Sequence, residues 1–230
     1  MSIKIAIIDS GVNPDHFHVQ GIEKGLSFFQ NDKKKIVQTD DFTDKIGHGT
    51  AIAGIIRKKA PFAKLYAIKI FYEKLSTQVS VLMAALNWAI DNDMQIINLS
   101  LGTKLTEYKK DMIKICSKAY KKNIFIVSSA KDISDPSFPS VFKTVTGVYW
   151  NRECDETDFV YHPHNPIDFG AHGRPRAIPG LPQELNFSGS SFAAAYMTGN
   201  IALQLKNDPN INVGDMKKSL GIGNLSMTDT

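Results

Sequence analysis

The sequence predicts an α/β protein whose largely parallel central sheet is covered by helices on both faces. Short apolar runs rich in β-branched residues alternate with longer segments in which apolar residues recur at helical spacing. The short runs carry few polar residues, as strands do when both of their faces are buried. The chain has 230 residues, 43% of them hydrophobic, which is enough for one substantial core. We therefore expect residues 1–230 to form a single three-layer domain.

The expected elements follow one another along the whole chain. Buried strands are predicted at residues 3–8, 64–70, 94–99 and 123–129, an edge strand at 25–29, and shorter strands at 143–148 and 166–169. Helices are predicted from residue 50 onward, at 79–92, at 108–122 and after residue 190. The helix at 108–122 is amphipathic, with its lysines facing outward. Residues 31–44 and 151–184 are polar or rich in Pro, His and Gly, and are expected to form loops.

Charge and cysteine content limit the possible partners and the compartment. The 27 basic and 23 acidic residues leave a net charge of +4, too small to indicate binding to nucleic acid or an acidic membrane. No apolar run reaches the length of a membrane span. The first apolar run is too short for a signal peptide, which predicts a cytoplasmic protein without a removable pro-segment. Two cysteines make no disulfide framework, and Cys116 is expected in the core.

The first polar residue of functional interest is Asp9, which directly follows the first buried strand. Open α/β sheets place their ligands and their chemistry at the carboxyl ends of the strands. A metal-dependent phosphoryl-transfer site would require a second carboxylate two residues later, and Gly11 stands there. From this segment alone, Asp9 is either a structural cap or a functional carboxylate.

His48 stands between two glycines at the start of a segment of small and apolar residues. Gly47 and Gly49 allow the backbone to turn tightly around it. A histidine at the start of a buried helix is partly shielded from water, and a neighbouring carboxylate can orient its imidazole. A structural and a catalytic histidine both fit this pattern.

A polar turn at Ser190 and Ser191 leads into a helix that is apolar or small on every side. Such a helix is buried, so its first turn lies inside the molecule. The free N–H groups and the partial positive charge of a helix N-terminus stabilise negative charge that develops beside them. One of the serines is therefore either a nucleophile or an N-cap.

Three segments resemble signature blocks of the subtilisin-like serine proteases, and they occur in that family's order. They are Ile8-Asp9-Ser10-Gly11, Gly47-His48-Gly49-Thr50 continuing to Ala53-Gly54, and Gly189-Ser190-Ser191-Phe192-Ala193. Segments 97–102 and 138–141 support the resemblance, which runs from residue 5 to about 205. It implies a subtilisin-like three-layer fold and a triad in which Ser191 attacks, His48 accepts its proton and Asp9 orients the imidazole. Ser191 is favoured over Ser190 because the family usually has a small Thr or Ser before the nucleophile.

The resemblance also implies how a peptide is held. In this family the strand containing Ser100, Leu101 and Gly102 pairs with an extended peptide or protein substrate, a form of β-augmentation. The opposite wall is implied at Ser128, Ser129 and Ala130, next to the pocket for the residue before the cut. The oligomeric state is not indicated.

The resemblance implies no cofactor for the chemistry. Secreted members of the family commonly bind calcium, and such sites cannot be assigned in this sequence. Asp40, Asp41 and Asp44 form an acidic loop, which leaves calcium binding open but unassigned.

Lys131 departs from the family pattern, because the matching residue is usually an asparagine that donates to the oxyanion. Loss of such a donor costs roughly 10²–10³ in kcat, a magnitude that comes from subtilisin and not from this chain. Either the Lys131 ammonium replaces the donor, or the Ser191 N–H stabilises the oxyanion nearly alone. A second departure, Ala195 in place of proline, is expected to have little effect because alanine favours helices.

These observations predict a cytoplasmic serine endopeptidase of the subtilisin-like class, dedicated to processing. The analogy with small subtilases suggests the removal of a leader peptide or the maturation of one specific protein. The alternative is a catalytically weak or inactive relative that binds an extended peptide as a chaperone or scaffold. Lys131 motivates this alternative, and the intact set of Asp9, His48 and Ser191 opposes it.

Overall fold

The first strand of the chain lies in the interior of the sheet. In a computed structural model that describes residues 2–225, β1 (Lys4–Asp9) lies between β4 (Lys64–Lys69) and β5 (Ile96–Leu99) and is parallel to both. The chain builds the sheet on the β4 side of β1 first and then crosses to the β5 side. The carboxyl ends of β1 and β5 therefore flank the point where the winding changes direction, where ligand crevices form in such sheets.

Nine strands form one sheet in the order β3-β2-β4-β1-β5-β6-β7-β9-β8. Pairing is parallel except at the two edges, where β2 pairs with β3 and β9 with β8 in antiparallel fashion. The remaining strands are β2 (Lys24–Gln30), β3 (Ile36–Thr39), β6 (Phe125–Ser129), β7 (Thr146–Trp150), β8 (Phe159–Tyr161) and β9 (Phe169–Ala171).

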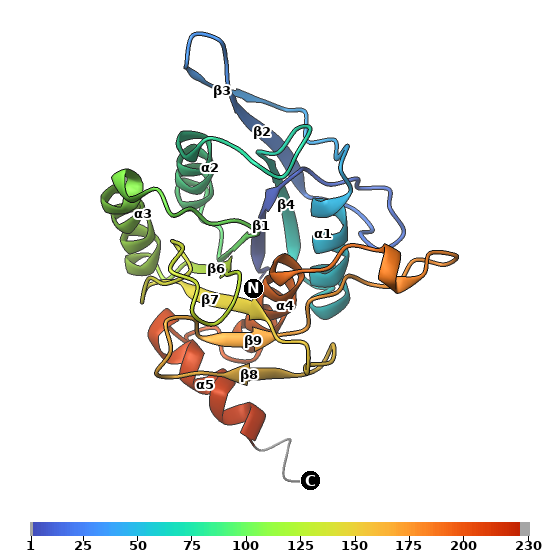
Figure 1. The fold of residues 1–230 in the computed structure, drawn as a ribbon, viewed down its shortest axis with the longest axis vertical. Coiled ribbons are helices and arrows are strands. Elements are labelled where there is room, and N and C mark those ends of the chain that lie inside the picture. The colour runs from blue at the N-terminus through green and yellow to red at the C-terminus, as the bar shows by residue number, and fades with distance from the viewer. Residues whose placement is uncertain (1, 226–230) are drawn as a thin grey trace.

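Helices cover both faces of the sheet, which confirms the predicted three-layer α/β class (Figure 1). Alternate residues of β1 serve the two layers: Ile5 and Ile7 enter one core, and Ala6 and Ile8 enter the other. The first core contains α1 (His48–Lys59), α4 (Ser190–Asn207) and α5 (Val213–Leu225), and the second contains α2 (Val79–Asp91) and α3 (Lys109–Lys121). Short 3₁₀ turns occupy Thr106–Tyr108 and Gln183–Leu185.

Both edges of the sheet differ from the sequence prediction. Strand β3 lies inside the predicted loop 31–44, so β2 is not the edge strand. Strands β8 and β9 lie inside the region 151–184, where only a strand at 166–169 was predicted, and α5 was not predicted. The edge strands β3 and β8 are only four and three residues long and are partly exposed. Their pairing therefore depends on contacts with the neighbouring strand more than on a local apolar pattern.

Candidate active site

Asp9 and His48 meet where β1 ends and α1 begins. Asp9 is the last residue of β1, His48 is the first residue of α1, and both are buried. His48 Nδ1 lies 2.8 Å from Asp9 Oδ1, which also accepts the Ser10 N–H at 2.7 Å. The Ser10 hydroxyl in turn accepts the Gly49 N–H at 2.9 Å. Two hydrogen bonds, from His48 to Asp9 and from Gly49 to Ser10, therefore fix the end of β1 against the start of α1.

Glycine is required on each side of His48 for a different structural reason. Gly47 has a φ of 90°, in the left-handed region that glycine adopts without strain. Gly49 is helical, but a Cβ there would overlap the Gly11 carbonyl oxygen and lie 3.2 Å from Asp9 Oδ1. The close approach of α1 to the end of β1 thus requires glycine at position 49.

Asp44, from the acidic loop, stabilises the start of α1. Its Oδ1 accepts the N–H groups of Ile46 and Gly47 at 3.0 and 2.8 Å. Its Oδ2 accepts both the N–H and the O–H of Thr50 at 2.9 and 2.6 Å. The carboxylate therefore satisfies free donors of the first turn and also places a negative charge near His48.

Burial and nearby charge act in opposite directions on His48. Burial lowers the pKa of the imidazole, whereas the charge and hydrogen bond of Asp9, followed by the charge of Asp44, raise it. The net result is a pKa above the ordinary histidine value. The rings of Phe187 and Phe192, with centroids 5.7 and 5.1 Å from that of His48, contribute to the burial.

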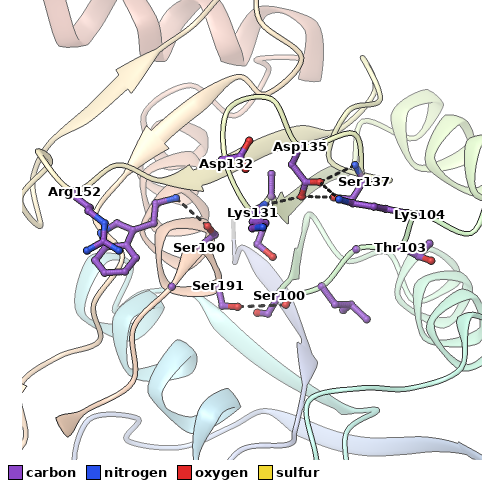
Figure 2. Close-up of a pocket in the computed structure, with 16 residues that line it drawn as sticks. Ser100, Thr103, Lys104, Lys131, Asp132, Asp135, Ser137, Arg152, Ser190 and Ser191 are labelled. Carbon is purple, nitrogen blue, oxygen red and sulfur yellow. Dashed lines mark hydrogen bonds and ion pairs between the residues drawn. The ribbon is translucent and has the colours of Figure 1, made fainter. Parts of the chain in front are cut away.

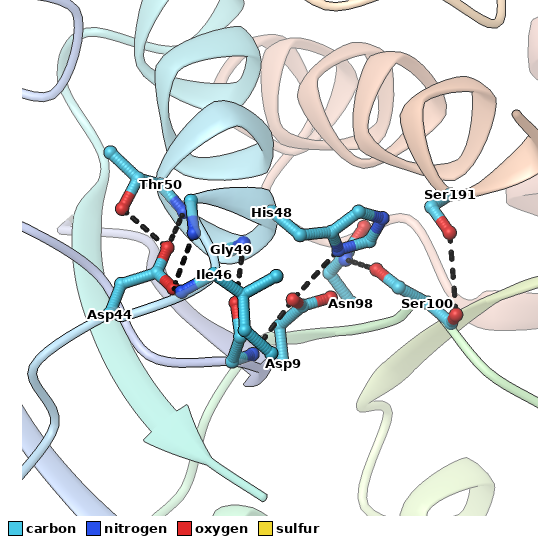
Figure 3. Close-up of polar contacts among 11 residues, drawn as sticks. Asp9, Asp44, Ile46, His48, Gly49, Thr50, Asn98, Ser100 and Ser191 are labelled. Atoms are coloured by element: carbon cyan, nitrogen blue, oxygen red, sulfur yellow. Dashed lines mark hydrogen bonds and ion pairs between the residues drawn. The ribbon is translucent and has the colours of Figure 1, made fainter. Parts of the chain in front are cut away.

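Ser191 lies in the first turn of α4, on the other side of His48 from Asp9 (Figure 3). Its hydroxyl donates to the Ser100 carbonyl at 3.3 Å, and the described residues contain no hydrogen bond between Ser191 and His48. Ser190 is held differently, because its Oγ accepts the Trp150 N–H at 3.0 Å. Helix α4 has no side-chain cap, and the Phe192 N–H donates to the Gly189 carbonyl at 3.1 Å, so within the described residues the N–H groups of Ser190 and Ser191 remain free.

A buried polar pair connects α4 to the strand that leads into the site. Thr198 donates its hydroxyl to Asn98 Oδ1 at 2.9 Å, and Asn98 Nδ2 donates to the Ser100 hydroxyl at 3.4 Å. Strand β5 ends at Leu99, so residues 100–102 continue from it without a neighbouring strand. The Ser100 and Leu101 carbonyls accept bonds only from the hydroxyls of Ser191 and Ser128 within the described residues, and an edge without a neighbouring strand is what pairing with an extended peptide requires.

A cavity of about 700 Å³ opens beside Ser191 (Figure 2). Residues 100–104 line one wall and residues 129–132 the other; the remaining lining residues are Asp135, Ser137, Trp150, Arg152, Gly189, Ser190 and Ser191. Of the residues implied to bind substrate, all but Ser128 line this cavity. Ser128 is fully buried behind the wall, where its hydroxyl donates to the Leu101 carbonyl at 3.4 Å.

Lys131 lines the cavity with its side chain free of hydrogen bonds and ion pairs within the described part of the chain. Its backbone N–H donates to Asp135 Oδ2 at 2.8 Å. Asp135 also accepts bonds from Ser137 and forms an ion pair with Lys104. The position of Lys131 is therefore set by a carboxylate four residues later.

Known proteins share both the sequence and the fold of this chain. A model described as "Subtilase family" matches residues 1–161. The chain belongs to the subtilase family. The matched span contains Asp9 and His48 and ends before Ser191. This assignment confirms the resemblance that the three sequence blocks indicated.

The curated relatives of this subtilase are long proteins that differ in location. The minor extracellular protease Epr of Bacillus subtilis is 29% identical over 222 residues, which cover 90% of this chain and 33% of the relative. Subtilisin E of the same species is 28% identical, with 90% and 56% covered. An intracellular serine protease of Paenibacillus polymyxa is 26% identical, with 96% and 75% covered. The chain thus spans only a third to about half of the first two relatives.

Solved structures support the fold of this subtilase. A lanthipeptide protease superposes with a TM-score of 0.69 at 22% identity, covering 94% of this chain and 78% of that protein. The nisin leader peptidase NisP from Lactococcus lactis superposes with a TM-score of 0.72 at 18% identity, covering 94% and 81%. At these identities the similarity establishes the subtilisin-like fold alone.

Sequence reasoning missed several residues that shape the site of this subtilase. Asp44 was predicted only as part of an acidic loop, and because it lies three residues before the N-cap Gly47, outside the usual capping positions, its bonds to the start of α1 had no sequence signal. Asp135, Lys104 and Arg152 had no local signal, because they reach the cavity from three separate loops. Within the described residues, no cluster of three or more His, Cys, Asp or Glu side chains is arranged to hold a metal ion. None of the described helices is long and apolar enough to cross a membrane.

Proposed function

We propose that this subtilase is a serine endopeptidase with Ser191 as nucleophile, His48 as general base and Asp9 as the residue that orients and stabilises the imidazole. The observation that carries the proposal is the buried 2.8 Å contact between His48 Nδ1 and Asp9 Oδ1. It leaves the second ring nitrogen of His48 for Ser191, which lies in the same site at the free N-terminus of α4. A base that is oriented by a carboxylate and faces a hydroxyl is the arrangement that activates serine.

The reaction would begin with a rotation of the Ser191 hydroxyl from the Ser100 carbonyl to His48 Nε2. Catalytic hydrogen bonds are often long or misaligned before substrate binds. His48 would then take the proton as Ser191 Oγ attacks the peptide carbonyl, and would give it to the departing amine. Water would release the acyl group by the same route in reverse, and the free N–H groups of α4 would stabilise the oxyanion in both steps.

The oxyanion could be stabilised in two ways: by the Lys131 ammonium together with the α4 N–H groups, or by the α4 N–H groups alone. If the Lys131 ammonium donates to the oxyanion, Lys131→Ala should lower kcat by roughly 10²–10³, and Lys131→Asn should retain more activity than the alanine variant. Equal kcat values for the wild type and Lys131→Ala would assign the oxyanion to the α4 N–H groups alone. KM should change little in either variant, because the donor acts mainly in the transition state.

The proposal is tested by labelling with a fluorophosphonate probe, which reacts with an activated serine. Wild-type protein should be labelled, and Ser191→Ala should not. The matched control is Ser190→Ala, which removes the neighbouring hydroxyl that accepts the Trp150 N–H and should leave labelling in place. Folded wild type that resists the probe, or labelling that survives Ser191→Ala, would contradict the protease function.

The proposed substrate is an extended peptide or protein segment held along residues 100–102. We propose a dedicated processing role in the cytoplasm, with leader-peptide removal as the first activity to test. The similar structures include a lanthipeptide protease and the nisin leader peptidase NisP, and one curated relative is an intracellular serine protease. Incubation with candidate precursor peptides, followed by mass spectrometry of the products, tests this role directly.

The chemistry assigned to the three residues needs no metal or cofactor, because both the base and the nucleophile are side chains. In the acidic loop, the carboxylate oxygens of Asp41 and Asp44, which could otherwise bind calcium, already accept hydrogen bonds from the protein. Asp44 accepts four hydrogen bonds, and Asp41 contacts Lys69 at 3.4 Å and accepts the Thr43 N–H at 2.9 Å. We propose that activity is independent of calcium, so incubation with EDTA should leave probe labelling unchanged.

A peptide-binding scaffold is the second candidate function. Two observations favour it: Lys131 replaces the usual oxyanion asparagine, and the Ser191 hydroxyl bonds to Ser100 and not to His48. A scaffold would bind peptides with equal affinity in wild type and Ser191→Ala and would not react with the probe. The labelling experiment therefore separates the two functions.

A further inference from the structure

We propose that the cavity beside Ser191 selects a lysine or arginine side chain in the residue before the scissile bond, with Asp135 as the contact for its positive charge. The proposal rests on the proposed protease function and names the substrate class of that site. Its central observation is a buried carboxylate in the cavity wall that forms an ion pair, among the described residues, with an exposed lysine of the protein itself.

Asp135 is buried, with 6% of its surface exposed, and lines the same cavity as Ser191. Its Oδ2 accepts the Lys131 N–H and the Ser137 hydroxyl, both at 2.8 Å, and its Oδ1 accepts the Ser137 N–H at 3.3 Å. Burial raises the pKa of this carboxyl, whereas these hydrogen bonds and the one from Lys104 lower it. The lowering effects together are larger, so the pKa of Asp135 lies below the ordinary value for an aspartate. The wall therefore carries a fixed negative charge at neutral pH.

Lys104 occupies the place that a substrate ammonium would take. Its Nζ lies 3.2 Å from Asp135 Oδ1, and it comes from the opposite wall, just beyond residues 100–102 (Figure 2). The Lys104 side chain is 63% exposed, so its ammonium can be hydrated when it leaves Asp135. A substrate lysine can therefore displace Lys104 into solvent while Asp135 keeps a cationic partner. The contact shows directly that a lysyl ammonium fits this position.

The other charges of the cavity do not reverse this preference. Lys131 and Arg152 are exposed, and the Arg152 guanidinium lies over the Trp150 ring at 4.4 Å, away from Asp135 in Figure 2. Asp132 is exposed and bonded to Ser134. Exposed charges are screened by water and salt, whereas the buried carboxylate is screened much less. An acidic side chain in the cavity would therefore meet the least screened charge, which repels it.

Internally quenched peptides that differ only in the residue before the cut test this selection. Lysine, arginine, norleucine and glutamate are compared, because norleucine keeps the apolar stem of lysine without its charge. In the wild type, kcat/KM should be at least about tenfold higher for lysine and arginine than for norleucine, and lowest for glutamate. Asp135→Asn should abolish most of the lysine-to-norleucine ratio.

Lys104→Met provides a second, independent variant, because it removes the competitor and leaves the wall carboxylate in place. The lysine-to-norleucine ratio should rise in this variant. Lys114→Met is the matched control: Lys114 is an exposed lysine of α3 that pairs with Asp111 outside the cavity, so the ratio should not change. If Asp135→Asn does not fold, Lys104→Met alone tests the proposal. A lysine-to-norleucine ratio of kcat/KM that is unchanged or lower in this variant contradicts the proposal.

Failure of the selection is distinguishable from failure of the protease function. A probe-labelled wild type that cleaves the norleucine peptide as well as the lysine peptide overturns the selection alone. Absence of both labelling and cleavage overturns the protease function. If labelled protein cleaves none of the four peptides, the same residues are compared as C-terminal peptide aldehydes that compete with the probe. The lysine aldehyde should then protect Ser191 at lower concentration than the norleucine aldehyde, and equal protection contradicts the selection.

Discussion

At the level of single residues, the environment of His48 decides the pH range in which the site can work. Asp9 accepts from one ring nitrogen, Asp44 adds a second negative charge from the helix cap, and two phenylalanine rings exclude water. A histidine acts as a general base only when it is neutral. Because its pKa is raised, the proposed activity should fall on acidification at a pH above the ordinary histidine pKa of about 6.5.

The pH dependence can be measured on the imidazole itself. In Asp9→Asn, the charge that raises the pKa of His48 is removed and the burial that lowers it remains, so the titration midpoint should shift to lower pH. NMR of the ring C–H protons against pH gives the midpoint in both proteins, and kcat/KM of the wild type should rise with pH through its own midpoint. Asp111→Asn, on α3, is a control that should not change the titration midpoint of His48. Equal midpoints in wild type and Asp9→Asn would show that the contact does not control His48.

At the level of elements, α5 is attached to the sheet by a half-buried ion pair. Lys217 Nζ contacts both oxygens of Asp168 at 2.9 Å and donates to the Val145 carbonyl at 2.7 Å, and Asp168 also accepts the Gly147 N–H. Burial raises the pKa of Asp168, and Lys217 and the Gly147 hydrogen bond only partly reverse this effect. The carboxylate therefore depends on Lys217 to remain ionised in this position.

Removal of Lys217 should destabilise the protein in a pH-dependent way. Lys217→Met leaves Asp168 without a counter-charge and should lower the free energy of unfolding by about 1–3 kcal/mol at pH 7. The folded-state pKa of Asp168 is raised, so protonation favours the folded state and the loss should shrink as pH falls toward 4.5. Urea denaturation at both pH values measures it. Lys218→Met changes the adjacent, exposed lysine and should stay within about 0.5 kcal/mol of wild type. A loss that is equal at the two pH values would exclude the ion pair as its cause.

At the level of the whole molecule, one strand supports both hydrophobic cores. Ile7 of β1 belongs to the core that contains α1 and α4, and the next residue, Ile8, belongs to the core that contains α2. Because the two layers share a sheet, we propose that the chain behaves as one domain that unfolds in one cooperative step. The alternative is that each helical layer unfolds separately from the sheet.

Truncation of either isoleucine tests this cooperativity. Ile7→Ala and Ile8→Ala should each lower the free energy of unfolding by about 2–5 kcal/mol, as deletions in well-packed cores do. Near-ultraviolet and far-ultraviolet circular dichroism should give coincident urea transitions in both variants. Ile36→Ala, on the exposed edge strand β3, is the matched control and should change little. Separate transitions for the two probes would show that the layers unfold independently.

Sequence reasoning found the parts of this protein whose signal is local. The strand at 3–8, the buried helix after Ser190 and the polar residues at element ends all follow from patterns within a dozen residues. The polar residues could be assigned to one site because the parallel sheet collects strand ends at one edge. Strand β3 was missed because it is short and partly exposed and gives no apolar pattern of its own, although its partner β2 directly precedes it. Helix α5 was missed because it is held by contacts with distant segments, such as the one between Lys217 and Asp168.

The sequence by itself determined the α/β class, the order of the central strands and of the first four helices, and the candidates Asp9, His48 and Ser191. These depend on residue periodicity and on motifs that each lie within a few positions. Only the tertiary structure decided that Asp135 is buried in the wall of the cavity, that Lys104 reaches it from the opposite wall, and that Ser128 lies behind the surface. The physical reason is that burial and charge pairing arise between segments far apart in the chain, where no local pattern records which side chains will meet.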